Sequence, residues 1–146
     1  MLAGAKDLPR LHADQHATRW PERWQMRQLD ELTVLIVGLG GIGAECASRF
    51  HALGAQVWGT TRTGAPVAGV DRLVQIEDLA AVMKDVDAIV VTLPGTDQTH
   101  HLVGEQLLTE AKPGLIVVNV GRGSVIDEVA LLDALNDERV AFAALD

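Results

Sequence analysis

The chain is 146 residues long, carries a net charge of −8 and has apolar residues at 48% of its positions. This length fits one domain of ordinary size, and the composition is that of a globular protein. The negative charge argues against nucleic-acid binding, which needs a basic face for the phosphates. Small anionic ligands are not excluded, because local dipoles and single arginines can hold them.

The cysteine and histidine content excludes further classes of protein. A single cysteine, Cys46, rules out an internal disulfide. Five histidines show no spacing that predicts a zinc site: His12, His16, His51, His100 and His101. No apolar run approaches the ~18 residues of a membrane span, and the opening MLAGAKD lacks the regions of a signal peptide. We therefore expect no metal, no membrane association and a cytoplasmic location.

Residues 1–30 differ from the rest of the chain. They are polar, the pattern predicts a helix as far as Trp20, and Pro21 marks a break. We interpret this segment as an N-terminal linker helix or arm. Two interpretations of Trp20 and Trp24 stay open: aromatic anchors on a neighbouring subunit, or cover for the core of the same domain.

From Leu32 onward, short β-rich runs alternate with longer helical patterns. The predicted strands are Thr33–Val37, Gln56–Thr60, Ala88–Thr92, Leu115–Val120 and Val140–Leu145. The predicted helices are Ile42–Leu53, Ile76–Lys84, Glu105–Glu110 and Glu128–Asn136. This alternation is the signature of parallel βαβ units, and strands that are apolar on both faces require helices on both sides of the sheet. We expect residues 31–146 to form a doubly wound Rossmann-type α/β fold with three layers, α/β/α.

Local signals refine two of the helices. In the first, the spacing of Ile42, Cys46, Phe50 and Leu53 predicts one apolar stripe that faces the core, with Cys46 as a core residue. Gly54 follows as a helix terminator. In the last helix, Asp127 stands at the N-cap position, where its side chain can accept hydrogen bonds from the first amides.

Three glycines follow the first strand in a G-x-G-x-x-G pattern, at Gly38, Gly40 and Gly43. A strand before the glycines and a helix after them are the context of a dinucleotide-binding turn. Gly38 permits the tight turn, Gly40 lets the backbone approach a pyrophosphate, and Gly43 lets helix and strand pack closely. The helix N-terminus then offers unpaired N–H groups to the phosphates.

The end of the second strand bears on which nucleotide is bound. An NAD site usually places Asp or Glu there for the ribose hydroxyls, but no acid occurs between Glu45 and Asp71. Thr61 stands at the corresponding place and Arg62 follows it. A hydroxyl and a guanidinium suit a 2′-phosphate, so we favour NADP over NAD.

Three later stretches resemble one family. They are VVTLPGTDQTHHLV at 90–103, LIVVNVGRGSVIDEVALLDAL at 115–135 and the terminal FAALD. Together with GLGGIG, they resemble the cofactor-binding domain of the D-isomer-specific 2-hydroxyacid dehydrogenases, with NVGRG as the most specific part. The resemblance implies hydride transfer between a nicotinamide dinucleotide and a small 2-hydroxy or 2-keto acid.

The resemblance also implies roles for individual residues. Arg122 would be catalytic, since in the family this arginine binds the carboxylate and keto oxygen of the substrate beside the nicotinamide. Cofactor contacts are implied for the remaining site residues: Gly41 and Ile42 at the pyrophosphate, Leu93, Pro94 and Thr99 near the adenosine, and Val120, Gly121, Arg122 and Asp146 on the nicotinamide side. His100 and His101 fall in a loop that varies in the family, and we expect both to be solvated.

The family's catalytic histidine and glutamate lie in a part that residues 1–146 do not include. We therefore expect an excised cofactor domain that binds nucleotide without turnover. As an apolar sheet edge, AFAALD predicts association, with a homodimer as the expected state. Two alternatives stay open: a non-catalytic nucleotide-sensing corepressor of the same fold, and another Rossmann enzyme such as a 3-hydroxyacid dehydrogenase, which would not explain NVGRG.

Overall fold

The structure is a computed structural model that describes residues 1–20 and 26–146. Its centre is a six-stranded, all-parallel sheet with the strand order β3-β2-β1-β4-β5-β6. The strands are β1 (Thr33–Val37), β2 (Gln56–Thr60), β3 (Arg72–Val74), β4 (Ala88–Val91), β5 (Leu115–Asn119) and β6 (Val140–Leu145). This is the strand order of a doubly wound Rossmann fold, as the sequence predicts.

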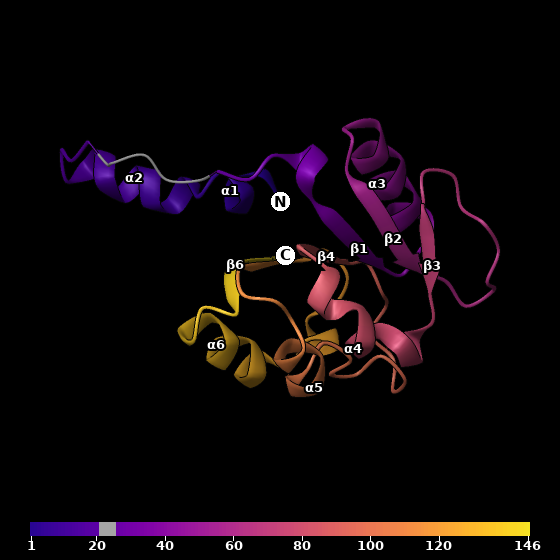
Figure 1. The fold of residues 1–146 in the computed structure, drawn as a ribbon. Coiled ribbons are helices and arrows are strands. Elements are labelled where there is room, and N and C mark those ends of the chain that lie inside the picture. The colour runs from indigo at the N-terminus through magenta and orange to yellow at the C-terminus, as the bar shows by residue number, and fades with distance from the viewer. Residues whose placement is uncertain (21–25) are drawn as a thin grey trace.

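Helices cover both faces of the sheet (Figure 1). On one face lies α3 (Gly41–Ala52); on the other lie α4 (Leu79–Val82), α5 (Glu105–Thr109) and α6 (Glu128–Asn136). The apolar core is divided in the same way. Alternate residues of β1 belong to different clusters, with Leu35 in the one under α4 to α6 and Ile36 in the one under α3. The three-layer prediction is confirmed.

One strand is missing from the sequence prediction. β3 has only three residues and pairs in parallel with β2, where Arg72 lies opposite Trp58. The Arg72 guanidinium also lies over the Trp58 ring, 4.5 Å from its centroid. A run this short carries too few residues for a periodic signal, so its strand conformation depends on the neighbouring strand.

One helix prediction, between β3 and β4, differs from the structure in its conformation. The predicted helix Ile76–Lys84 is a composite: a 3₁₀ turn at Ile76–Asp78, then α4, then a 3₁₀ turn at Met83–Asp85. By contrast, α6 has the predicted bounds and the predicted cap, because Asp127 Oδ1 accepts from Val129 N at 3.0 Å and Ala130 N at 3.2 Å.

The predicted stripe on the first helix is wrong at both ends. Ile42 is 61% exposed and Leu53 is 57% exposed, whereas Gly43 and Ala47 are the residues that α3 buries. The two middle residues of the predicted stripe, Cys46 and Phe50, are partly buried and pack against the core. Cys46 is partly buried, and this burial raises the pKa of its thiol.

The N-terminal segment forms two short helices instead of one. α1 (Leu2–Ala5) lies beside β6 and α2 (Leu8–His16) leads away from the sheet (Figure 1). Between them, Asp7 adopts a positive φ of 50°, which ends the first helix. Trp20 is 98% exposed and does not cover the core. The predicted break at Pro21 and the role of Trp24 lie outside the described residues.

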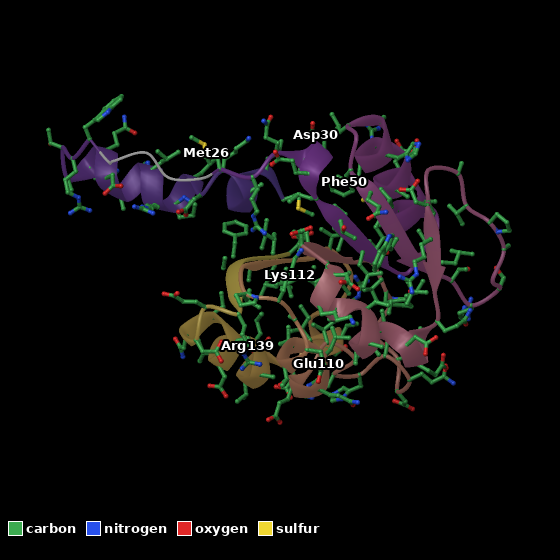
Figure 2. The ribbon with its side chains drawn as sticks, in the orientation of Figure 1. Met26, Asp30, Phe50, Glu110, Lys112 and Arg139 are labelled. Atoms are coloured by element: carbon green, nitrogen blue, oxygen red, sulfur yellow. The ribbon has the colours of Figure 1, made fainter. Side chains whose placement is uncertain are left out.

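The amino-terminal ends of the central strands are held together by the Asp87 carboxylate. Asp87 accepts a hydrogen bond from Thr33 N at 2.9 Å. Lys112, labelled in Figure 2, places its Nζ 2.8 Å from Asp87 Oδ1. These contacts fix the starts of β1, β4 and β5 relative to one another, which leaves the carboxyl ends of the strands to form the site.

Candidate dinucleotide-binding site

The candidate site lies at the carboxyl ends of the parallel strands. The strand order reverses between β1 and β4, because the chain continues from β1 to β2 on one side and returns through β4 on the other. Ligands of open α/β sheets bind in the crevice at such a switch point. The glycine turn after β1 and the loops after β4 and β5 meet there.

The glycine turn is fixed by two threonines from neighbouring strands. Gly38 has a φ of +106°, a conformation that favours glycine. Its N–H donates to Thr60 Oγ1 at 2.9 Å, and its carbonyl accepts from Thr92 Oγ1. The sequence analysis missed both threonines. Their only signal in the sequence is a polar, β-branched residue where a predicted strand ends; in the structure Thr60 ends β2 and Thr92 directly follows β4.

Gly43 is required by packing within the chain. A Cβ at Gly43 would lie 2.0 Å from the Gly38 carbonyl oxygen and 2.9 Å from Thr92 Oγ1. No side-chain rearrangement removes a clash with a backbone oxygen. The predicted role of Gly43, close packing of helix against strand, is therefore present in the structure.

Gly40 and Gly41 have a different environment. A Cβ at either position would meet nothing within 4 Å, and Gly40 has an ordinary φ of −78°. Neither strain nor internal packing requires glycine at these positions, so the space beside them is open to a ligand. The first backbone bond of α3 runs from Ala44 N to Gly40 O at 2.8 Å, so the preceding amides have no partner within the helix. These residues fit a bound pyrophosphate.

The loops after β4 and β5 pack directly on each other. A Cβ at Gly121 would lie 2.4 Å from Leu93 O, so the two backbones are in contact. Buried Asn119, 2% exposed, shapes the second loop: its Oδ1 accepts from Gly121 N at 2.9 Å and its Nδ2 donates to Arg122 O at 3.1 Å. The sequence analysis also missed Asn119: it quoted this residue within NVGRG but gave it no role.

Arg122 lies on a groove of about 470 Å³ in this region. The groove is lined by Ile42, Thr92, Leu93, Pro94, Gly95, Val120, Gly121, Arg122 and Ser124. The Arg122 side chain is exposed and donates from Nη1 to Gly121 O at 3.0 Å. Among the described residues no carboxylate lies within ion-pair distance of it. The groove therefore brings together six of the predicted site residues around an uncompensated positive charge.

Thr99 stabilises the loop after β4. Its hydroxyl donates to Pro94 O at 2.7 Å and accepts from Thr96 N at 2.9 Å. The loop is thereby closed on itself beside the groove, and the contact of Thr99 with a cofactor stays a prediction.

Thr61 and Arg62 follow β2 on the other side of the glycine turn. Thr61 Oγ1 lies 3.2 Å from Thr63 Oγ1 in a local turn. Arg62 is exposed and has no ion pair or hydrogen bond within the described part of the chain. Its guanidinium is accordingly available to an anion.

Val120 and Asp146 lie at the ends of β5 and β6. Val120 N donates to Val91 O at 3.0 Å, and its side chain is 38% exposed on the groove. Asp146 N donates to Asn119 O at 3.0 Å, which places Asp146 at the same edge as the other site residues.

His100 and His101 do not line this groove, although His101 N donates to the carbonyl of the groove residue Ser124 at 2.9 Å. Their rings are stacked, with centroids 3.9 Å apart, and His101 Nδ1 lies 3.6 Å from Asp127 Oδ2. His101 lines a separate hollow of about 360 Å³ together with Asp127 and Glu77. Both histidines are exposed, as the sequence analysis expects, and His101 also has a carboxylate neighbour.

The strand order, the switch point and the glycine turn define a dinucleotide-binding domain of the Rossmann type. Residues 1–146 match the family model described as D-isomer specific 2-hydroxyacid dehydrogenase, NAD binding domain. The chain belongs to this family, as the sequence motifs predict.

Known relatives agree with this assignment. A glyoxylate/hydroxypyruvate reductase B of Enterobacter agglomerans is 38% identical over 112 residues, which are 76% of this chain and 35% of that protein. The solved phosphoglycerate dehydrogenase of Lactobacillus plantarum has a TM-score of 0.93 at 32% identity, over 100% of this chain and 47% of that one. A D-isomer specific 2-hydroxyacid dehydrogenase of Xanthobacter autotrophicus Py2, solved with NADPH and MES, has a TM-score of 0.90 at 34% identity, over 99% and 46%.

The chain spans less than half the length of these relatives. Of two further curated relatives it covers 46% and 28% of the length. It is the nicotinamide-dinucleotide-binding domain of the family. In the described part of the chain no helix is long and apolar enough to cross a membrane.

Proposed function

We propose that this protein is an oxidoreductase that transfers hydride between a nicotinamide dinucleotide and a small 2-hydroxy or 2-keto acid. Residues 31–146 would hold the cofactor and residues 1–30 would form a linking arm. The observation that best supports this function is that the exposed Arg122 shares its groove with Ile42, which follows the open backbone at Gly40 and Gly41. When bound, the nicotinamide would supply or accept hydride at its C4.

In this proposal Arg122 would grip the substrate carboxylate and stabilise the negative charge that develops on the substrate oxygen. Its position supports this role, because Asn119 holds the loop beneath it and no carboxylate of the described residues neutralises it. Gly40, Gly41 and Ile42 would contact the pyrophosphate, and Gly38 and Gly43 would shape the cofactor-binding turn. The remaining proposed cofactor contacts are Leu93, Pro94, Thr99, Val120, Gly121 and Asp146.

Turnover is tested by following NADPH oxidation in the presence of glyoxylate or hydroxypyruvate. Residues 1–146 alone are expected to bind nucleotide without reducing either acid, because the family's proton-donating histidine is not among them. That group is worth roughly 10²–10⁴-fold in rate. Reductase activity in this 146-residue polypeptide would contradict the expectation that residues 1–146 alone do not turn over. Activity in the full-length protein that survives Arg122→Ala would contradict the role of Arg122.

We further propose that the site prefers NADP to NAD. The support is the unpaired, exposed Arg62 beside Thr61, with no acid at the end of β2 to repel a 2′-phosphate. Calorimetric titration should give tighter binding of NADPH than of NADH. Arg62→Ala should weaken NADPH binding roughly tenfold and leave NADH binding unchanged, since a charge-assisted hydrogen bond is worth about 1.5–3 kcal/mol.

Arg49→Ala is the matched control, because it removes the same charge at the far end of α3, where Arg49 pairs with Glu45. Equal affinities for the two nucleotides in the unaltered chain would mean that Arg62 does not read the phosphate. Binding of neither nucleotide would mean that the glycine turn by itself does not make a site.

A homodimer is the proposed assembly. The arm carries exposed apolar side chains, with Leu2 58% and Leu8 49% exposed, and Met26 after it is 45% exposed (Figure 2). β6 is an edge strand with Leu145 56% exposed. Such surfaces favour association. Sedimentation velocity of the purified chain should show a dimer, and a clean monomer at micromolar concentration would refute it.

The corepressor alternative gains no support, because the relatives described above carry reductase or dehydrogenase names.

A further inference from the structure

Two histidines of α2 lie outside the dinucleotide site. His12 and His16 are four residues apart on this nine-residue helix, so they share one face. Their Nε2 atoms are 3.1 Å apart, and the rings meet edge to face with centroids 4.5 Å apart. Both side chains are exposed. The two Nε2 atoms thus face each other beside the helix in a hydrogen bond.

This separation suits two ligands of one metal ion. With metal–nitrogen bonds of about 2.0–2.1 Å and angles between 90° and tetrahedral, two ligand nitrogens lie roughly 2.9–3.4 Å apart. The observed 3.1 Å falls within that range. Chelation therefore preserves the separation of the two nitrogens, while an ion replaces the proton between them and the rings turn their lone pairs toward it.

The neighbouring carboxylate does not complete the site. Asp14 is 8% exposed and is held by Arg19, whose Nε and Nη2 donate to its Oδ1 at 3.0 and 2.8 Å. In residues 1–20 and 26–146 no group of three or more His, Cys, Asp or Glu side chains converges. The histidine pair is accordingly a two-ligand site whose other coordination positions are open to water.

We propose that His12 and His16 form a chelating site on α2 for a divalent transition-metal ion that prefers imidazole: Zn²⁺, Ni²⁺ or Cu²⁺. The sequence analysis expected no metal because the spacing of the histidines predicts no zinc site, whereas the structure brings the two Nε2 atoms together. Binding also links two turns of a short helix. A nine-residue helix is marginal without tertiary packing, so a bound ion stabilises α2 by mass action.

The test uses the chain without an affinity tag, titrated with NiCl₂ by calorimetry in a weakly coordinating buffer. Ni²⁺ is the probe because imidazole suits it, whereas softer ions select thiolates such as that of Cys46. One ion per chain is expected. His12→Ala and His16→Ala should each weaken binding roughly tenfold or more, given that even outer-shell partners of metal ligands are worth 10–100-fold.

His100→Ala is the matched control, since that ring is stacked on His101 and has no i,i+4 partner; it should bind Ni²⁺ as the unaltered chain does. A second measurement does not rely on calorimetry. Amide hydrogen exchange over residues 8–16 should become slower when Ni²⁺ is added to the unaltered chain, and should not change in either variant. The proposal is wrong if both single variants bind Ni²⁺ as tightly as the unaltered chain, or if exchange over α2 does not respond to the ion.

Discussion

Gly43→Ala is expected to destabilise the domain by about 3 kcal/mol or more, at the upper end of the cost of overpacking a dense interior. The added Cβ would lie 2.0 Å from the Gly38 carbonyl oxygen. The same Cβ would lie 2.9 Å from Thr92 Oγ1, the donor to Gly38 O, so relief requires α3 to move away from the end of β1. For a domain of this size such a loss lowers Tm by roughly 10 °C, and scanning calorimetry measures it.

Gly40→Ala is the matched control in the same turn, and it separates binding from stability. Its Cβ meets nothing within 4 Å and its φ of −78° suits alanine, so Tm should stay unchanged or rise slightly. NADPH affinity should fall roughly tenfold or more, because the methyl group would occupy the space proposed for the pyrophosphate. A Gly40→Ala chain that binds NADPH normally would show that the ligand does not approach this backbone. A Gly43→Ala chain with an unchanged Tm would show that α3 can shift at little cost.

Asn119→Ala is expected to have the second-largest effect. The substitution removes the partners of Gly121 N and Arg122 O in one step, and each unsatisfied group costs about 1–3 kcal/mol if it stays buried. The loop that carries Arg122 would lose its fixed shape. We expect a loss of about 2–4 kcal/mol in the free energy of unfolding, measured by urea denaturation, together with weaker NADPH binding.

Asn136→Ala serves as the comparison, because this exposed residue at the end of α6 is the same side chain without a recorded side-chain hydrogen bond in the described structure. It should change the free energy of unfolding by less than about 0.5 kcal/mol. If Asn119→Ala and Asn136→Ala behaved alike, the amide of Asn119 would not hold the loop, and the position of Arg122 would depend on the contact between Gly121 and Leu93 alone.

Several elements were predictable to the residue. Thr33–Val37, Gln56–Thr60 and Val140–Leu145 have the same bounds in the sequence prediction and in the structure. Two of these strands are flanked by other strands and carry continuous β-branched or apolar runs, since a parallel sheet buried on both faces demands them. The cap at Asp127 was predictable for a different reason, because capping depends on residues three apart in the chain.

The candidate site was predictable where backbone conformation requires a residue type. Gly38 and Gly43 belong to that group, since a positive φ and a close approach of backbone both favour glycine. Arg122 was predicted from the family resemblance, and its role stays a prediction. The exposure of Ile42 was not predictable, because the spacing of apolar residues identifies a face without showing how closely that face packs. Gly43 and Ala47 are the residues of α3 that are buried against the sheet. Because both are small, a search for large apolar residues does not find them.

By itself, the sequence determined the alternation of strands and helices, the glycine turn and the family, since all of these depend on local periodicity or on residues near one another in the chain. Only the tertiary structure decided which side chains hold that turn in place. Thr60 lies 22 residues from Gly38 and Thr92 lies 54 residues from it, yet both bond to its backbone. β3 likewise exists through pairing with β2. Contacts of this kind come from strands that meet side by side, and no local pattern in the chain records which strands those are.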